Sequence, residues 1–141
     1  MAFFSQDQLE AIAGALADTA DGLTGPEIGH LLASCKIADP GPMTKRVRIY
    51  NAFAECQNTK QNRTNILEFI RLAMKPARYS REPHRYEPMR ARLNLALAFA
   101  GLVVDESGEM KSADVAQTLL EAQRRATATH SPIRPRRFSG R

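Results

Sequence analysis

Apolar residues recur along most of the chain at the three- and four-residue spacing of amphipathic helices, and capping residues or prolines separate one apolar run from the next. Two predicted helix starts carry a complete capping box, Ser5 with Gln8 and Thr24 with Glu27. Apolar residues on either side of each box predict a hydrophobic staple, which directs the chain into the helix. The two capped helices follow each other closely and predict an αα-hairpin at the start of the fold.

The rest of the pattern predicts a mainly α fold with one small β-hairpin. The long apolar helix near residue 90 begins between Pro83 and Pro88, because a proline is tolerated only in the first helical turn. Asn65 is the predicted cap of the preceding helix, and Leu95 and Phe99 are expected to widen the buried stripe of the long one. The expected elements are helices from residue 6 to residues 20–22 and over 24–36, 43–56, 65–74, 83–100 and 113–126, a polar loop over 57–65, and a hairpin with its turn at 105–108.

Length and composition favour one compact domain of five to six helices over residues 1–126. The 141-residue chain is 43% hydrophobic, which suits a single core, and residues 127–141 form a basic, proline-containing tail that we expect to be disordered. No apolar run approaches the length of about 20 residues that a spanning helix needs, and the first residues lack the pattern of a signal peptide. We therefore expect a cytoplasmic protein with no membrane segment.

The two cysteines and the rest of the sequence offer no motif for a cofactor, a metal ion or a small-molecule substrate. Cys35 and Cys56 lie on separate predicted helices without the spacing of a redox or metal motif, so we expect buried thiols. His30 stands near Cys35 without other ligands nearby in the sequence, and a structural role is expected for it.

Charge is segregated along the chain. Residues 1–44 carry one lysine and six carboxylates, whereas residues 45–99 carry twelve lysines and arginines and four carboxylates. Residues 127–141 add four arginines and no acid to a net charge of +5 for the whole chain. Such segregation predicts a basic face, suited to a polyanion or to a protein partner of complementary charge.

The first three predicted helices have the order of a helix-turn-helix domain, with the hairpin in the place of a wing. In such domains the first residues of the later helix enter the DNA major groove, so Lys45, Arg46 and Arg48 are candidates for contacts to phosphate or guanine. Pro40 and Pro42 lengthen the connection beyond the usual three to four residues. The alternative is an ordinary helical bundle in which these cations form a solvated face.

A second candidate surface lies in residues 75–92, where cationic and tyrosine side chains alternate. Arginines beside exposed aromatic rings suit neutralisation of a phosphate backbone combined with base stacking, and a protein-interaction surface uses the same residue types. The candidate binding residues in this segment are Arg78, Tyr79, Arg81, Arg85, Tyr86 and Arg90.

Weaker patterns suggest nucleic-acid chemistry of other kinds. GLTG at residues 22–25 has the form of the GXXG loop of KH domains, but acidic neighbours and missing strands count against it. Arg78 with His84, and Arg125 with His130, match the loose arginine-histidine spacing of metal-independent HEPN ribonucleases. Such matches arise easily by chance in a chain this rich in arginine.

Three segments in order, LTGPEIGHLLASCKIADPGPMTKRVRIYNAF, NRTNILEFIRLAMKPARY and LNLALAFAGLVVDESGEMKSADVAQTLLEAQRRA, resemble the N-terminal module of the Ymh-type bacterial conserved hypothetical proteins. In that family the helical module precedes a HEPN-like domain linked to anti-phage defence and mobile elements. The resemblance covers residues 4–126 and stops where THSPIRPRRFSGR begins. It implies a bacterial module without the HEPN-like domain, so that domain's nuclease activity does not carry over.

These observations predict a non-enzymatic nucleic-acid-binding module, with DNA as the expected ligand, from a bacterial defence or mobile-element protein. One alternative is a helical module for protein interaction or homodimerisation, in which the acidic first helices meet a basic partner. The other is a metal-independent ribonuclease that uses the arginine-histidine pairs.

Overall fold

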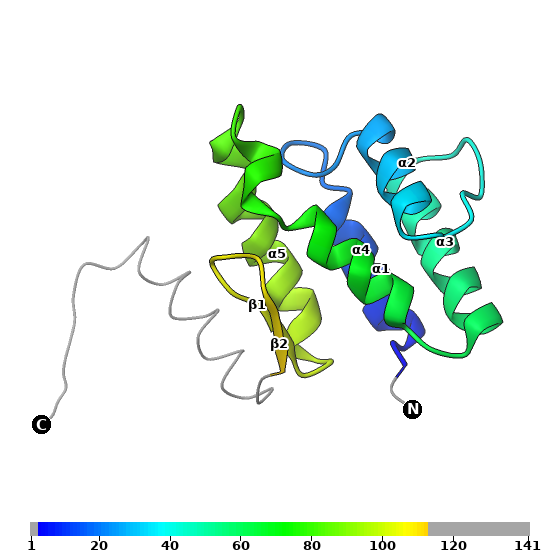
Figure 1. Cartoon of the computed structure of the whole chain (residues 1–141). Helices are drawn as coiled ribbons and strands as arrows, with labels where there is room; N and C mark the ends of the chain where they lie inside the picture. Colours follow the sequence, from blue (N-terminus) through cyan, green and yellow to red (C-terminus); the bar gives the residue numbers. More distant parts are fainter. Residues whose placement is uncertain (1–2, 113–141) are drawn as a thin grey trace, which may run out of the picture.

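Five α-helices, two short 3-10 helices and one β-hairpin make up residues 3–112, the part of the chain that the computed structural model describes (Figure 1). The mainly α fold with a small hairpin is therefore confirmed. The sixth predicted helix and the predicted disordered tail lie outside the described residues. The elements are α1 (Gln6–Leu16), α2 (Gly25–Ser34), α3 (Lys45–Lys60), α4 (Thr64–Ala73), η1 (Pro76–Tyr79), η2 (Pro83–Arg85), α5 (Tyr86–Ala98), β1 (Leu102–Val104) and β2 (Met110–Ser112).

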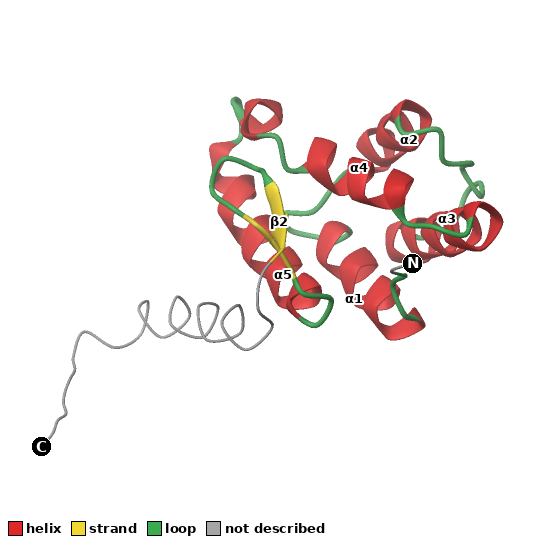
Figure 2. Cartoon of the chain, turned by 60° about the horizontal axis from the view of Figure 1, so that its bottom comes forward, coloured by secondary structure: helices red, strands yellow, loops and turns green. Residues whose placement is uncertain are grey.

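Helix α1 lies between α5 and α3, and both views show it flanked by these two helices (Figures 1 and 2). Helix α2 packs mainly on α4 and α3, so α1 and α2 are not each other's main partners and the expected αα-hairpin is wrong. The aromatic rings of Phe53 and Phe69 meet edge to face, with 5.0 Å between their centroids, where α3 crosses α4. The hydrophobic core is continuous across the helices, from Phe4 to Val104.

Both predicted capping boxes form, at Ser5 with Gln8 and at Thr24 with Glu27. Helix α1 nevertheless ends at Leu16, several residues before the predicted end. The reason lies in Asp18, whose Oδ2 accepts the amide hydrogens of two following residues, each over 3.0 Å, and so favours a turn over a further helical turn.

Helices α3 and α4 also differ from their predicted bounds. Helix α3 continues to Lys60, because Gln57 is buried and exchanges two hydrogen bonds of 2.9 Å with the backbone of Phe4. The start of the predicted polar loop over residues 57–65 is therefore helical. Helix α4 begins at Thr64, and Asn65 is not its cap; its Nδ2 donates to the carbonyl oxygen of Cys35 over 2.8 Å.

Helix α5 begins at Tyr86, within the predicted window, and carries the hairpin on one side. Val104 of β1 exchanges hydrogen bonds of 2.8 Å and 3.0 Å with the side chain of Asn94. In the antiparallel hairpin, Leu102 pairs with Ser112. Leu95 and Phe99 were expected to be buried, and this is wrong, because they remain 51% and 65% exposed on the side of α5 away from the hairpin.

Candidate nucleic-acid interface

The structure places the nine candidate binding residues in three different environments. The distribution separates cations that hold the fold together from cations that face solvent. Tyr79, Arg85, Tyr86 and Arg90 are buried, Lys45 and Arg48 are half-buried, and Arg46, Arg78 and Arg81 are exposed.

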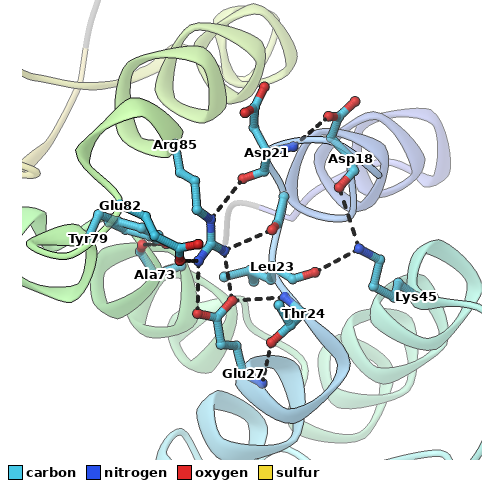
Figure 3. A network of polar contacts seen from close by, with 11 residues as sticks. Asp18, Asp21, Leu23, Thr24, Glu27, Lys45, Ala73, Tyr79, Glu82 and Arg85 are labelled. Atoms are coloured by element: carbon cyan, nitrogen blue, oxygen red, sulfur yellow. Dashed lines mark hydrogen bonds and ion pairs between the residues drawn. The ribbon is translucent and has the colours of Figure 1, made fainter.

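Arg85 is the centre of a polar network that joins η2 to the loop between α1 and α2 (Figure 3). Its Nη2 donates to the carbonyl oxygen of Gly22 over 2.8 Å and to Oε1 of Glu27 over the same distance. Its Nη1 donates to Glu27 over 3.2 Å and to Glu82 over 2.9 Å. The hydrogen bond from Arg85 lowers the pKa of Glu27. Every terminal nitrogen of Arg85 is therefore occupied within the protein.

The two tyrosines of the segment face inward rather than toward a ligand. The hydroxyl of Tyr79 donates to the carbonyl oxygen of Ala73 over 2.6 Å, and that of Tyr86 donates to the carbonyl oxygen of Met74 over 2.9 Å. The guanidinium carbon of Arg85 lies 5.0 Å from the centre of the Tyr79 ring. Burial raises the pKa of Tyr79 to about 12. The expectation of exposed stacking rings is wrong, because both hydroxyls find acceptors at the buried end of α4.

At the start of α3, two of the three candidate cations serve internal contacts. Lys45 Nζ donates to the carbonyl oxygen of Leu23 over 2.9 Å, on the opposite side of the α1–α2 loop from Arg85 (Figure 3). Arg48 pairs with Asp39 over 2.6 Å and donates to the carbonyl oxygen of Gly25 over 3.1 Å. Arg46 alone of the three is exposed, which leaves this helix start with little charge for a ligand.

The opposite charges of the two chain segments meet inside the fold. Arg48 and Arg85 pair with acids of residues 1–44, and Arg92 lies 3.5 Å from each of the carboxylates of Asp18 and Asp21. Arg90 donates to the carbonyl oxygen of Val104 over 2.8 Å and pairs with Glu87 over 2.9 Å. Three arginines of the basic segment are thus paired with acids of residues 1–44, and Arg90 is paired with an acid of its own segment.

Four cationic or titratable side chains remain exposed on the segment that contains η1 and η2. They are Lys75, Arg78, Arg81 and His84, and none of them forms an ion pair with any of residues 3–112. They recur every third residue, the period of a 3-10 helix, whereas Tyr79 and Arg85 from the same segment point into the protein. Sequence reasoning left Lys75 and His84 out of the candidate site, although this period was visible in the sequence.

The weaker chemical candidates gain no site from the described residues. Residues 3–112 hold no group of three or more His, Cys, Asp or Glu side chains that could bind a metal ion. Cys35 and Cys56 are buried, as predicted, and burial raises the pKa of Cys35 to about 11. The GLTG segment, residues 22–25, leads into α2, and the carbonyl oxygens of Gly22 and Leu23 accept hydrogen bonds from Arg85 and Lys45. Arg125 and His130 lie outside the described residues.

No protein-family model, no curated protein and no solved structure matches this chain. The resemblance to the Ymh-type proteins therefore stays a prediction. None of the helices in residues 3–112 is long and apolar enough to cross a membrane.

Proposed function

We propose that the protein is a non-enzymatic nucleic-acid-binding module that contacts phosphates through Lys75, Arg78, Arg81 and His84. The observation that carries the proposal is the division of charges in this segment. Neighbouring Arg85 is satisfied by protein acceptors, whereas these four side chains face solvent without a carboxylate partner among the described residues. Exposed cations in a short segment are suited to replace the counterions around a phosphate backbone.

The way in which the segment is held supports the same function. Tyr79 and Arg85 anchor its backbone to α4 and to the α1–α2 loop. A segment that is ordered before binding loses little conformational entropy when it meets its ligand. Because Tyr79 and Tyr86 are buried, the segment offers cations for phosphates and no exposed aromatic ring for bases. We therefore expect binding with little sequence preference.

DNA is the ligand that the helix order favours, with Arg46 as a further contact from the start of α3. The assignment to a bacterial defence or mobile-element protein rests on the resemblance to the Ymh-type proteins alone. A nuclease role through Arg78 and His84 is the less supported alternative, because no third catalytic group of the described residues is bound to either side chain.

The proposal is tested by fluorescence anisotropy on the whole chain with a labelled duplex at increasing salt. Three phosphate contacts, one each from Lys75, Arg78 and Arg81, predict a slope of log K against log salt of about −2.7, which is roughly a 40-fold loss of affinity between 50 and 200 mM salt. Arg78→Gln with Arg81→Gln should weaken binding and reduce the slope by about 1.8. Lys36→Gln with Lys60→Gln removes the same charge from exposed positions elsewhere and should leave the slope unchanged.

Two results would contradict phosphate binding at this segment. One is equal loss of affinity in both double variants, which would indicate a response to net charge rather than a site. The other is no binding to duplex or single-stranded DNA or RNA at low salt. Cleavage of RNA by the wild-type protein that disappears in His84→Ala would overturn the non-enzymatic assignment and favour the ribonuclease.

A further inference from the structure

Among the four exposed side chains of residues 75–85, which we name the η1–η2 segment, His84 is the one that can change its charge at moderate pH. Histidine is the side chain that ordinarily titrates between pH 5 and pH 8, whereas lysine and arginine stay positive over that range. His84 is exposed at the end of the row of cations, in η2. The number of positive charges that the segment offers to a ligand therefore depends on pH.

We propose that protonation of His84 strengthens the binding of nucleic-acid phosphates by the η1–η2 segment, so that affinity rises as the pH falls from 8 to 5.5. The inference rests on the proposed function, because it adds one contact to those of Lys75, Arg78 and Arg81. A protonated imidazole donates through both ring nitrogens, whereas the neutral ring has one N–H and no charge. Only the protonated form therefore makes a charge-assisted hydrogen bond to a phosphate.

The carboxylates on the elements around η2 are already paired with arginines. Helix α5 and η1 pack against η2, and Arg85 ties η2 to the α1–α2 loop and to α2. The acids of these elements are Asp18, Asp21, Glu27, Glu82 and Glu87, and each lies within 3.5 Å of a nitrogen of Arg85, Arg90 or Arg92. Within residues 3–112, none of these acids forms an ion pair with His84. A charge gained by His84 therefore stays available to a ligand.

The remaining charged groups around η2 determine how a ligand acts on His84. Tyr79 and Tyr86 stay neutral, because burial raises their pKa values. Lys75, Arg78 and Arg81 are positive, and like charges on one short segment oppose the uptake of a further proton. A phosphate bound to these cations reverses the sign, since a nearby negative charge favours the charged imidazole. Because linkage is reciprocal, the protonated segment then binds the phosphates more tightly.

One additional phosphate contact changes both the affinity and its dependence on salt. Each contact contributes about −0.9 to the slope of log K against log salt, so the slope should move from about −2.7 at pH 8 toward about −3.6 at pH 5.5. Between 1 M and 0.1 M salt, the same contact is worth roughly eightfold in affinity. For an imidazole that titrates near pH 6.5, linkage converts this into roughly a sixfold gain in affinity between pH 8 and pH 5.5.

The test is fluorescence anisotropy on the whole chain with a labelled DNA duplex, measured at several pH values in 0.1 M salt. The wild-type protein should bind about six times more tightly at pH 5.5 than at pH 8. His84→Gln should lose most of this gain, and His84→Lys, which carries a permanent charge, should bind with similar affinity at both pH values. The matched control is His30→Gln, which removes an exposed histidine from α2 and should keep the wild-type gain.

Two results would overturn this inference without affecting the proposed function. One is a wild-type affinity and salt slope that are the same at pH 8 and pH 5.5. The other is a gain at low pH that persists in His84→Gln, which would place the titrating group elsewhere. In both cases, weaker binding by Arg78→Gln with Arg81→Gln at pH 8 would still support the phosphate contacts. Absence of binding at every pH would overturn the inference together with the proposed function.

Discussion

Replacing Arg85 with methionine tests whether the basic part of the chain serves mainly to hold the fold together. Methionine keeps an unbranched apolar stem and removes the guanidinium that binds Gly22, Glu27 and Glu82. The side chain of Arg85 is only 8% exposed, while those of Glu27 and Glu82 are 27% and 56% exposed. The change therefore deprives one buried carbonyl and one half-buried carboxylate of their partner.

The expected loss of stability follows from these exposures. Removal of one partner from a fully buried ion pair costs about 3–5 kcal/mol, because the other charge is left without compensation. Water reaches Glu27 and especially Glu82, so the expected loss in the free energy of unfolding is lower, about 2–3 kcal/mol. Urea unfolding of the full chain measures it, and the midpoint should fall by roughly 1 M or more.

The matched control is Arg81→Met, which changes an exposed arginine four residues earlier on the same segment. Its free energy of unfolding should stay within about 0.5 kcal/mol of the wild-type value. If Arg85→Met also stays within that limit, the network in Figure 3 contributes nothing to stability. The claim that internal ion pairs of the basic segment stabilise the fold would then be wrong.

The ion pair between Arg85 and Glu27 also makes the stability of the protein depend on pH in a defined direction. The hydrogen bond from Arg85 lowers the pKa of Glu27 below its ordinary value of 4.5. A carboxylate with a lowered pKa in the folded state stabilises the protein above its unfolded-state pKa, and this contribution is lost as the pH falls through the folded-state pKa. The difference in stability between wild type and Arg85→Met should therefore be largest near pH 7 and shrink below pH 4.5. A difference that stays constant down to pH 3 would contradict the assignment.

Three further predictions concern the fold. Gly108→Ala should unfold at a lower urea concentration than Gly41→Ala. Both glycines have a positive φ, but only a Cβ at Gly108 would come close to a backbone oxygen, 2.3 Å from that of Met74. Equal unfolding midpoints would argue against this close approach. Gln57→Leu should lower the free energy of unfolding by about 1–3 kcal/mol and speed amide exchange at the N-terminus, since it leaves buried backbone groups without partners; unchanged exchange would refute this. Cys35 and Cys56 should react with a thiol reagent only after denaturation, because both are buried with raised pKa values; a rapid reaction in the native protein would contradict their burial.

Local signals in the sequence were enough for the starts of α1 and α2. The capping boxes at Ser5 and Thr24 form as predicted, because each is a set of contacts within four residues. The hairpin turn forms for the same reason, since Asp105 Oδ1 accepts the backbone amides of Ser107 and Glu109. Features of this kind depend little on the rest of the fold.

Two of the errors came from contacts between residues that are distant in the sequence. Gln57 extends α3 because it binds Phe4, 53 positions away, and a polar run alone gives no sign of that. Arg85 was predicted to bind a ligand because the sequence shows no internal acceptor near it. Its acceptor, the carbonyl oxygen of Gly22, lies 63 positions away. Composition cannot distinguish an arginine that faces solvent from one that is buried with acceptors until the fold brings the acceptors to it.

The charge segregation along the chain is therefore weaker evidence for a basic surface than the counts suggest. Arg48, Arg85 and Arg92 of the basic segment form ion pairs with acids of the first 44 residues. Each of these pairs neutralises one positive charge of the basic segment and one negative charge of the acidic segment. What distinguishes the exposed cations is their repeat of three residues from Lys75 to His84, against the inward positions of Tyr79 and Arg85. A ligand that recognises this protein by charge should respond to that short repeat and be insensitive to the net charge of the surrounding segment.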